Sequence, residues 1–288
     1  MCKIVKNVRD HEALRKSFNE LAIETFDLNF EDWYQNGFWR DKYIPYSMVI
    51  DGRVAANVSV NRTDMLWKGS RKRLIQLGTV MTKESYRNRG LIRRLMEEII
   101  KDFEAEADGI YLFANDSVLD FYPKFGFRKA VEWQYSKKIF GTGEEIVRRA
   151  PMENSEDWKV LIKAIESSVP QGKFELTDNS DLIMFYVSKF MQDNVYYLSE
   201  QQAYVIAEPQ GDELILYNIF APKRIDPETV AKAFGNKIQK LSLCFVPWEN
   251  TGYEKELLCK EDNTFFVKGE LFEEFEREQL RFPDLAHA

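Results

Sequence analysis

The chain has 288 residues, of which 44% are hydrophobic and 30% are charged, and its formal net charge is -7. This composition excludes a generally disordered chain, and the acidic balance argues against a nucleic-acid partner, because nucleic-acid-binding domains carry a net basic surface. At a typical size of about 150 residues per domain, the length predicts two domains.

The first half of the chain predicts alternating helices and strands. Apolar residues recur with the helical period over 10–26, and Asp51-Gly52 separates two short strand patterns within 46–60, as in a tight hairpin. The later elements are a strand at 73–81, a helix at 90–106, a strand at 109–115, a short helix ended by Gly126 and a strand at 127–139. This order predicts a mixed α and β layer.

A break in the pattern follows within 140–158, where two glycines, a proline and several polar residues interrupt the periodic segments. We therefore expect one domain at 1–145 and a second α+β domain at 150–288. The second half predicts helices at 156–167, 180–192 and 226–234, a hairpin at 203–222 and a strand at 238–246. This order repeats that of the first half, which indicates either a degenerate internal duplication or the ordinary alternation of helices and strands.

The three cysteines, Cys2, Cys244 and Cys259, form no CxxC pair, so neither a disulfide framework nor a metal site is predicted. The N-terminus has no apolar signal core, and no stretch approaches the roughly 20 apolar residues that span a bilayer. We expect a cytoplasmic protein without a membrane partner. The oligomeric state is left open.

The stretch "SYRNRGLIRRLM", residues 85–96, places three arginines around one glycine at the start of the helix at 90–106. The free N–H groups of a helix N-terminus carry partial positive charge, so this charge pattern predicts an external anion rather than a side-chain partner. A glycine lets backbone N–H groups converge on the anion, and Arg87 and Arg89 can neutralise phosphate charge from the side. The pattern fits a pyrophosphate.

The same stretch resembles the acyl-CoA-binding motif of the GCN5-related N-acetyltransferases (GNAT superfamily), in which Arg or Gln is followed after two residues by Gly and then by a small residue. Arg87 and Gly90 match this motif, and Ile92 departs from it at the small position. "FYPKFGF", residues 121–127, resembles the later family motif of Tyr, three residues and Gly-Phe. The resemblance covers roughly residues 1–140.

The resemblance implies a GNAT-type mixed, mostly antiparallel sheet flanked by helices, followed here by a second α+β domain that could be a degenerate GNAT-like repeat. It implies an acyl-CoA-dependent N-acyltransferase that moves an acetyl group from acetyl-CoA to a primary amine, by direct attack in a ternary complex. By position, the expected cofactor-binding residues are Val80, Met81, Thr82, Arg87, Asn88, Arg89, Gly90, Leu91, Ile92 and Asn115. Tyr122 matches the usual general acid, which would protonate the leaving thiolate; a core aromatic is the alternative.

The general base is left open. The strand at 73–81 holds no acidic residue, and Gln76 cannot take a proton, so candidates are a water chain or the carboxylates of Glu24, Asp27 and Glu31. His11 is interpreted as a surface residue. The apolar end "FRFPDLAHA" suggests either a docked tail or a terminal carboxylate at Ala288 that acts in the site.

The acceptor is expected to be a small-molecule or lysine-type amine, and the acidic balance favours a cationic one such as a polyamine, an aminoglycoside or a lysine side chain. A catalytically inactive acyl-CoA sensor or partner-binding module is the alternative, favoured by Ile92 and by the missing strand carboxylate. A relative that takes its acyl group from a charged tRNA is a further enzyme alternative, against which the acidic balance and the CoA-type motif argue. The aromatic segment 32–39 is either a lid over an amine or packing under the N-terminal helices.

Overall fold

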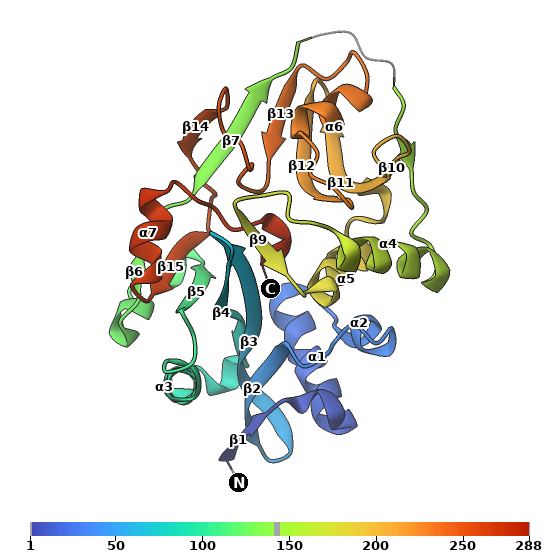
Figure 1. Cartoon of the computed structure of the whole chain (residues 1–288). Coiled ribbons are helices and arrows are strands. Elements are labelled where there is room, and N and C mark those ends of the chain that lie inside the picture. Colours follow the sequence, from blue (N-terminus) through green and yellow to red (C-terminus); the bar gives the residue numbers. More distant parts are fainter. Residues whose placement is uncertain (1, 141–144, 288) are drawn as a thin grey trace.

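The structure, a computed structural model, describes residues 2–140 and 145–287. The described residues form two mixed β-sheets, A and B, which lie one above the other in Figure 1 with helices around and between them. Sheet A has the strand order β1 (Cys2–Lys6), β2 (Tyr43–Ile50), β3 (Arg53–Trp67), β4 (Ser70–Thr82), β5 (Gly109–Ala114), β15 (Thr264–Lys268) and β6 (Arg128–Lys129), and β9 (Phe174–Thr177) pairs with β3. Sheet B has the order β14 (Glu254–Leu257), β7 (Trp133–Lys138), β13 (Lys240–Leu243), β12 (Glu213–Phe220), β11 (Ala203–Gln210), β10 (Val195–Leu198) and β8 (Arg148–Arg149).

Sheet A is mostly antiparallel, which confirms the expected fold class. The predicted hairpin at Asp51-Gly52 joins β2 to β3, and both turn residues have the positive φ angles, 49° and 80°, that this connection needs. Among the described strands of sheet A, one pair is parallel, β4 with β5, and the helix α3 (Leu91–Phe103) makes the crossover between them.

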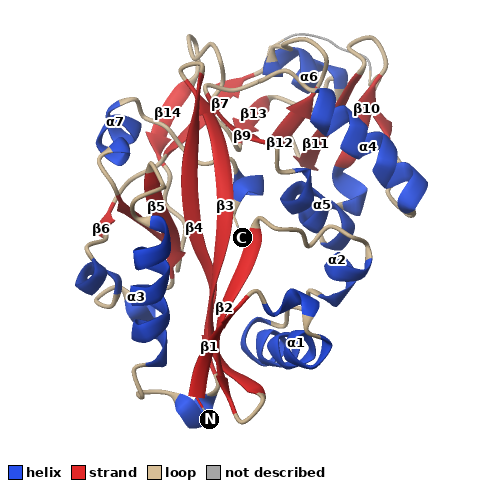
Figure 2. Cartoon of the chain, turned by 60° about the horizontal axis from the view of Figure 1, so that its bottom comes forward, coloured by secondary structure: helices blue, strands red, loops and turns tan. Residues whose placement is uncertain are grey.

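Helices cover both faces of sheet A, because side chains alternate across each strand. Met48 of β2 packs in one apolar cluster with Leu95 of α3, whereas the next residue, Val49, packs on the other face in a cluster with Phe18 of α1 (Glu12–Phe26). Figure 2 shows α3 and α1 on opposite sides of the long strands β3 and β4. The helices predicted at 10–26 and 90–106 are thereby confirmed.

Sheet B repeats part of this arrangement. The hairpin β11–β12 is followed by α6 (Pro227–Ala233) and by β13, which pairs parallel with β12 as β5 does with β4. The order supports the internal duplication as a hypothesis. The starts of α3 and α6 differ, however, because the Asp226 side chain caps α6 by accepting from the N–H of Glu228.

The two sheets exchange strands across the expected domain boundary. The single strand predicted at 127–139 is two strands: β6 stays at the edge of sheet A, and β7 joins sheet B. Glu132 lies between them, where its buried carboxylate accepts from the N–H of Phe282 at 2.7 Å. Conversely, β15 from the second half of the chain joins sheet A, where it pairs with β5. The division at 145 and 150 stays a prediction, since hydrogen bonds of both sheets cross it.

The aromatic segment 32–39 packs between the sheets. Trp33 and Trp39 are only 5% and 3% exposed, and the indole N–H of Trp33 donates to the carbonyl of Asp181 in α5 (Ser180–Lys189) at 2.9 Å. The packing interpretation is confirmed and the lid is wrong. The remaining helices are α2 (Glu31–Gln35), α4 (Ser155–Ser167) and α7 (Leu271–Arg277).

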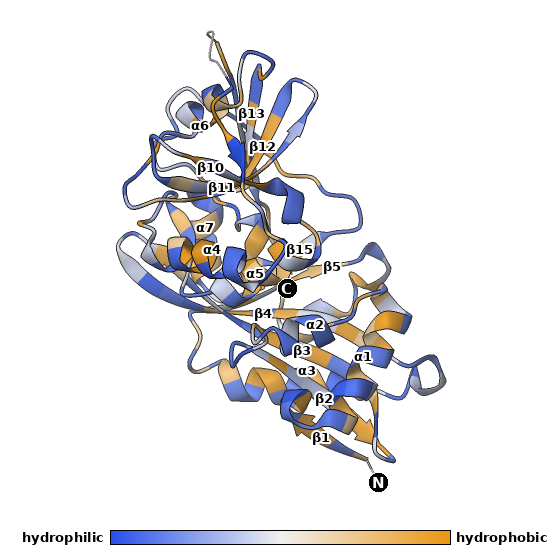
Figure 3. Cartoon of the chain, turned by 90° about the vertical axis from the view of Figure 1, so that its right-hand side faces the viewer, coloured by the Kyte–Doolittle hydropathy of each residue, from blue (hydrophilic) through white to orange (hydrophobic). Residues whose placement is uncertain are grey.

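Hydrophobic residues follow the strands of both sheets in Figure 3, where they form the apolar clusters that hold the sheets and helices together. Among the residues that the structure describes, no helix has the length and apolar character to cross a bilayer.

Candidate active site

The candidate site begins where β4 and β5 separate. The two strands pair from Leu74 and Gly109 to Leu77 and Leu112, and no register pair joins them beyond that point in the described chain, although β4 continues to Thr82. The separation leaves a gap in the middle of sheet A. The strands β4 and β5 therefore diverge beyond Leu77 and Leu112.

A bulge in β4 re-aims the strand end at this gap. Gly78 pairs with Ser59 and Met81 with Asn57, so two residues of β4, Thr79 and Val80, lie opposite one residue of β3. Thr79 has a φ of 47°, and its carbonyl accepts from the Asn57 amide at 3.0 Å. Its hydroxyl is 2.6 Å from that of Tyr43. These contacts hold the bulge in a fixed conformation.

The helix α3 starts beside the gap with an open N-terminus. Gly90 is its N-cap with a φ of 70°, and among the described residues no side chain caps the helix and its first turn holds no acidic residue. The first N–H groups of a helix have no intrahelical acceptor. A Cβ atom built on Gly90 would meet nothing within 4 Å, so the space in front of these N–H groups is open. Such a helix start fits a phosphate-bearing ligand.

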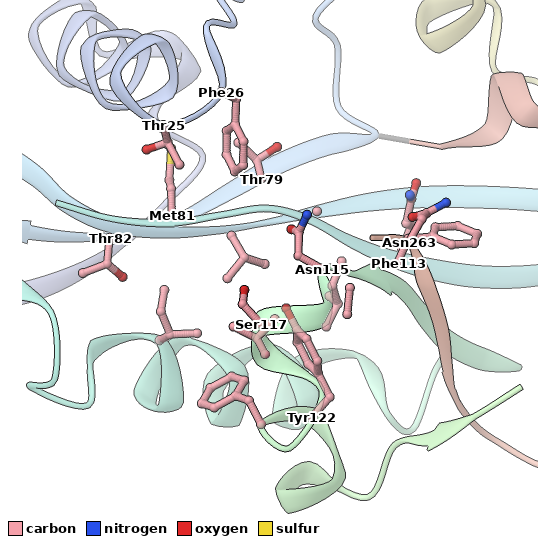
Figure 4. A pocket seen from close by; sticks show the side chains of 18 of the residues that line it. Thr25, Phe26, Thr79, Met81, Thr82, Phe113, Asn115, Ser117, Tyr122 and Asn263 are labelled. Carbon is pink, nitrogen blue, oxygen red and sulfur yellow. The ribbon is translucent and has the colours of Figure 1, made fainter. Parts of the chain in front are cut away.

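A cavity of about 800 Å³ connects these features; we call it the main cavity (Figure 4). Its lining comes from the end of α1, from β4, from the start of α3, from β5 with the turn after it, from α5, from the loop before β15 and from the end of the described chain. The lining residues are Thr25, Phe26, Gln76, Leu77, Gly78, Thr79, Val80, Met81, Thr82, Arg87, Ile92, Phe113, Ala114, Asn115, Ser117, Val118, Phe121, Tyr122, Tyr186, Asn263 and His287.

Tyr122 lies in this cavity on a 3₁₀ turn, Tyr122–Phe125, that Gly126 ends with a φ of 83°. The side chain is 4% exposed and packs against the rings of Phe121 and Phe266 at 5.4 and 5.6 Å. Burial raises the pKa of Tyr122 to about 12, so the phenol keeps its proton at neutral and mildly alkaline pH. It can act as a hydrogen-bond donor or as an acid in the cavity.

The predicted site residues fall into two groups, those that line the main cavity and those that lie in the turn beside it. Val80, Met81, Thr82, Arg87, Ile92, Asn115 and Tyr122 line the main cavity. Asn88, Arg89, Gly90 and Leu91 lie in the adjoining turn, where Arg89 stacks on Tyr86 at 5.0 Å and the Leu91 side chain is buried in the core. The N–H groups of Gly90 and Leu91 belong to the helix start, where no intrahelical carbonyl accepts from them.

Ile92 lines the cavity and also packs against the apolar cluster around α3. Its branched side chain therefore leaves the cavity in place beside Arg87. Asn115 is fixed from the second half of the chain: its amide donates to the Asp262 carboxylate at 2.6 Å, and the same carboxylate accepts from the N–H of Asp116 at 2.6 Å.

The sequence does not predict the part of the lining that comes from the second half. Tyr186 of α5 lines the cavity, and its hydroxyl donates to the backbone carbonyl of His287 at 2.6 Å. The His287 ring stacks on Phe113 with 4.0 Å between centroids. In the sequence, only the apolar, proline-containing end of the chain indicated that the second half contributes to the site. Ala288, whose carboxylate was a candidate base, lies outside the described residues.

None of the three candidate carboxylates of the first helical region lines the main cavity. Glu31 instead pairs with Arg15 at 3.0 Å, which lowers the pKa of the Glu31 carboxyl. Glu24 and Asp27 lie near the end of α1, beside the lining residues Thr25 and Phe26. The described lining contains no Asp or Glu, and its ionisable groups are Arg87, Tyr122, Tyr186 and His287.

A family model described as an acetyltransferase (GNAT) domain matches residues 11–130. These residues contain every element from α1 to β6, and with them the gap, the bulge and the open helix start. The comparison with curated proteins finds no match to the chain.

Solved structures with the same fold cover nearly the whole chain. A conserved protein of unknown function from Enterococcus faecalis V583, described as a probable N-acyltransferase, superposes with a TM-score of 0.62 at 14% identity, over 96% of this chain and 74% of its own. Eis1 from Mycobacterium abscessus gives 0.55 at 12% identity, over 92% and 73%. A GCN5-related N-acetyltransferase from Kribbella flavida gives 0.54 at 14% identity, over 93% and 72%. These similarities show the fold of both halves together.

Proposed function

Because residues 11–130 of the chain belong to the GCN5-related N-acetyltransferase superfamily, we propose that the protein is an acyl-CoA-dependent N-acyltransferase that acetylates a primary amine. One observation carries the proposal: the main cavity runs from Arg87 and Ile92 at the open start of α3, past the gap between β4 and β5, to Tyr122. It thus joins an anion-binding helix start to a buried proton donor.

The residues present fit acetyl-CoA. The N–H groups of residues 88–92 and the Arg87 guanidinium would hold the pyrophosphate, and the end of β4 from Val80 to Thr82 would pair with the pantetheine arm, with Asn115 on the opposite side. When bound, acetyl-CoA supplies the thioester that an amine attacks. Tyr122 would donate its proton to the sulfur that leaves, and its burial excludes water from that transfer.

The reaction is proposed as a direct transfer within a ternary complex. The cysteines do not line the main cavity, which fits a mechanism without a covalent enzyme intermediate. The acceptor is proposed as a small-molecule or lysine-type amine.

We expect the protein to release free CoA from acetyl-CoA when a suitable primary amine is present. The measurement is thiol release, followed with a chromogenic disulfide, over a panel that holds polyamines, aminoglycosides, lysine peptides and alkyl and aromatic amines. Mass spectrometry of the amine should show the added acetyl group. The absence of any acetylated product across the panel, with acetyl-CoA shown to be bound, would contradict the proposal.

The same experiment addresses the second candidate function, an acyl-CoA sensor without catalysis. The observation that favours it is the absence of Asp and Glu from the described lining of the cavity. Tight binding of acetyl-CoA without turnover would support the sensor. Turnover with acetyl-CoA in the absence of RNA would likewise exclude a tRNA-dependent acyl transfer.

Arg87→Ala is expected to weaken acetyl-CoA binding at least about tenfold, which corresponds to about 1.4 kcal/mol and is less than the typical value of one hydrogen bond to a charged group. Isothermal titration calorimetry at moderate salt measures it. Arg94→Ala is the matched control, because Arg94 is an exposed arginine one turn further along α3 that does not line the cavity. Equal affinities of the two variants would contradict the placement of the pyrophosphate.

A further inference from the structure

The main cavity has two sides, one on each face of sheet A. Met81 of β4 belongs to the apolar cluster that contains the buried residues of α1, whereas the preceding residue, Val80, packs against the cluster around α3. Figure 4 shows Phe26 on one side of β4 and Tyr122 on the other. We call these two parts of the cavity the α1 side and the α3 side.

The proposed acetyl-CoA site occupies the α3 side. Arg87, the open start of α3 and the buried phenol of Tyr122 all lie there. The gap between β4 and β5 connects the two sides, because the strands no longer pair beyond Leu77 and Leu112. An amine held on the α1 side can therefore reach the thioester through the gap, and the α1 side is left for the acceptor.

The α1 side is mostly aromatic and apolar. Phe113 of β5 packs on the face of sheet A opposite to its neighbours Leu112 and Ala114, which lie in the cluster around α3. Tyr186 packs against the cluster of α1, and Phe26 ends that helix with 45% of its side chain exposed. The exposed part of Phe26 is apolar surface that a ligand can cover. Lining residues on this side are Phe26, Thr79, Met81, Phe113, Tyr186 and His287.

Charge is confined to the other end of the cavity. Burial lowers the pKa of His287 to about 3 and raises the pKa values of Tyr122 and Tyr186, so these three side chains are neutral at pH 7. Arg87, at the start of α3, is then the one charged side chain in the lining that the structure describes. A second positive charge on an acceptor would leave water on the α1 side without meeting a counter-charge, which is costly.

We propose that the acceptor is a small primary amine whose carbon skeleton is apolar or aromatic and carries no second positive charge; this rests on the proposed N-acyltransferase function. Phe26 and Phe113 would contact the skeleton. The cavity of about 800 Å³ has the size of a site for one drug-sized ligand, and the acyl-CoA arm takes part of it, so the acceptor is small. The acidic balance of the whole chain, which favours a cationic acceptor, does not extend to this lining.

The lining also suits the form of the amine that reacts. Enclosure without a counter-charge favours a neutral amine over an ammonium ion, and the neutral nitrogen has the lone pair that attacks. This lone pair forms a bond to the thioester carbonyl carbon, and the C–S bond breaks with its electron pair on sulfur. The sulfur takes the proton of Tyr122. The nitrogen gives one proton to water, and Tyr122 regains one from water.

The test compares pentylamine with 1,4-diaminobutane, which has the same number of non-hydrogen atoms but ends in a second ammonium group. We expect kcat/KM to be at least about 100-fold higher for pentylamine, because the second ammonium group finds no counter-charge. The amine 2-phenylethylamine should be acetylated at least as well as pentylamine. Thiol release at saturating acetyl-CoA measures all three values.

Phe26→Ala is expected to lower kcat/KM for 2-phenylethylamine about tenfold, as for the loss of an apolar contact, with the acetyl-CoA affinity changed less than threefold. Ile23→Ala is the matched control, since Ile23 is also 45% exposed, lies one turn earlier in α1 and does not line the cavity. Thr25→Asp places a carboxylate in the lining. It should raise kcat/KM for 1,4-diaminobutane at least about threefold without raising that for pentylamine.

The contrary outcomes separate this inference from the proposed function. If the unaltered protein acetylates no amine of any charge, the proposed function fails and the inference fails with it. If the protein acetylates 1,4-diaminobutane or an aminoglycoside as well as it does pentylamine, the function stands and the inference is overturned. Equal effects of Phe26→Ala and Ile23→Ala would overturn the placement of the acceptor on the α1 side.

Discussion

Tyr122→Phe is expected to lower kcat at least about 100-fold, because a positioned acid contributes about 10²- to 10⁴-fold to proton transfer. The phenyl ring fills the same space against Phe121 and Phe266, so the cavity and the acetyl-CoA affinity should be retained. Steady-state kinetics with a saturating amine, together with calorimetric binding of acetyl-CoA, measures both quantities. An unchanged affinity beside a large loss of kcat is the signature of a group that acts in the transition state.

The raised pKa of Tyr122 gives this prediction a pH dependence. A phenol with a pKa of about 12 stays protonated up to about pH 11, so Tyr122 should cause no loss of kcat as the pH rises from 7 to 10. Tyr253→Phe is the matched control, since it removes a phenol far along the chain that does not line the cavity. Equal rates in Tyr122→Phe and Tyr253→Phe would contradict the acid role.

The sequence predicted the elements that carry local signals. The amphipathic helices α1 and α3 have apolar faces at a regular spacing, and the hairpin at Asp51-Gly52 has the residues that its turn requires. The Arg87 and Gly90 pattern marked the helix start that lines the cavity. These features depend on residues close together in the chain, so hydrophobic periodicity and turn residues were sufficient to predict them.

The missed features depend on contacts between distant residues. The strands β9, β14 and β15 are short, and they are strands because a neighbouring edge pairs with them; β15 lies between β5 and β6. The strand predicted at 127–139 divides because Glu132 turns inward to meet Phe282, 150 residues away. Neither hydrophobic periodicity nor turn residues indicate a contact with a residue so distant in the sequence.

The same limit applies to the site. Tyr122 and the residues around Arg87 were found because they lie in two short motifs, whereas Tyr186 and His287 reach the cavity through the packing of α5 and of the C-terminal segment, residues 280–287. The residues beside His287 in the sequence give no sign that its ring stacks on Phe113. The second half therefore completes the lining of a cavity whose motifs lie in the first.

Arg281→Ala is expected to lower the free energy of unfolding by about 3 kcal/mol or more, since removing one partner of a buried ion pair costs about 3–5 kcal/mol. Arg281 is 1% exposed, pairs with Asp284 and donates to the carbonyl of Leu243. Its loss would leave these acceptors buried beside a space that water fills poorly. Urea unfolding, followed by tryptophan fluorescence, gives the free energy and its slope.

The pH dependence of this effect follows from Asp284. Burial acts to raise the pKa of Asp284, but the charges of Arg281 and Lys260 outweigh it and lower this pKa to about 2, whereas an unfolded Asp has a pKa of about 3.9. A depressed carboxyl pKa stabilises the fold above about pH 4, and this contribution is lost as the pH falls toward 2. Arg281→Ala should therefore lose less stability on acidification over this range than the unaltered protein does.

Arg277→Ala provides the control for Arg281, because the Arg277 side chain is 74% exposed and lies 3.9 Å from Glu274. An exposed pair of this kind contributes at most about 1 kcal/mol, so this variant should unfold almost as the unaltered protein does. Similar free energies for the two variants would contradict the anchoring of the C-terminal segment by Arg281. A large difference would show that residues 280–287, of which His287 lines the main cavity, are held in place by the buried charge of Arg281.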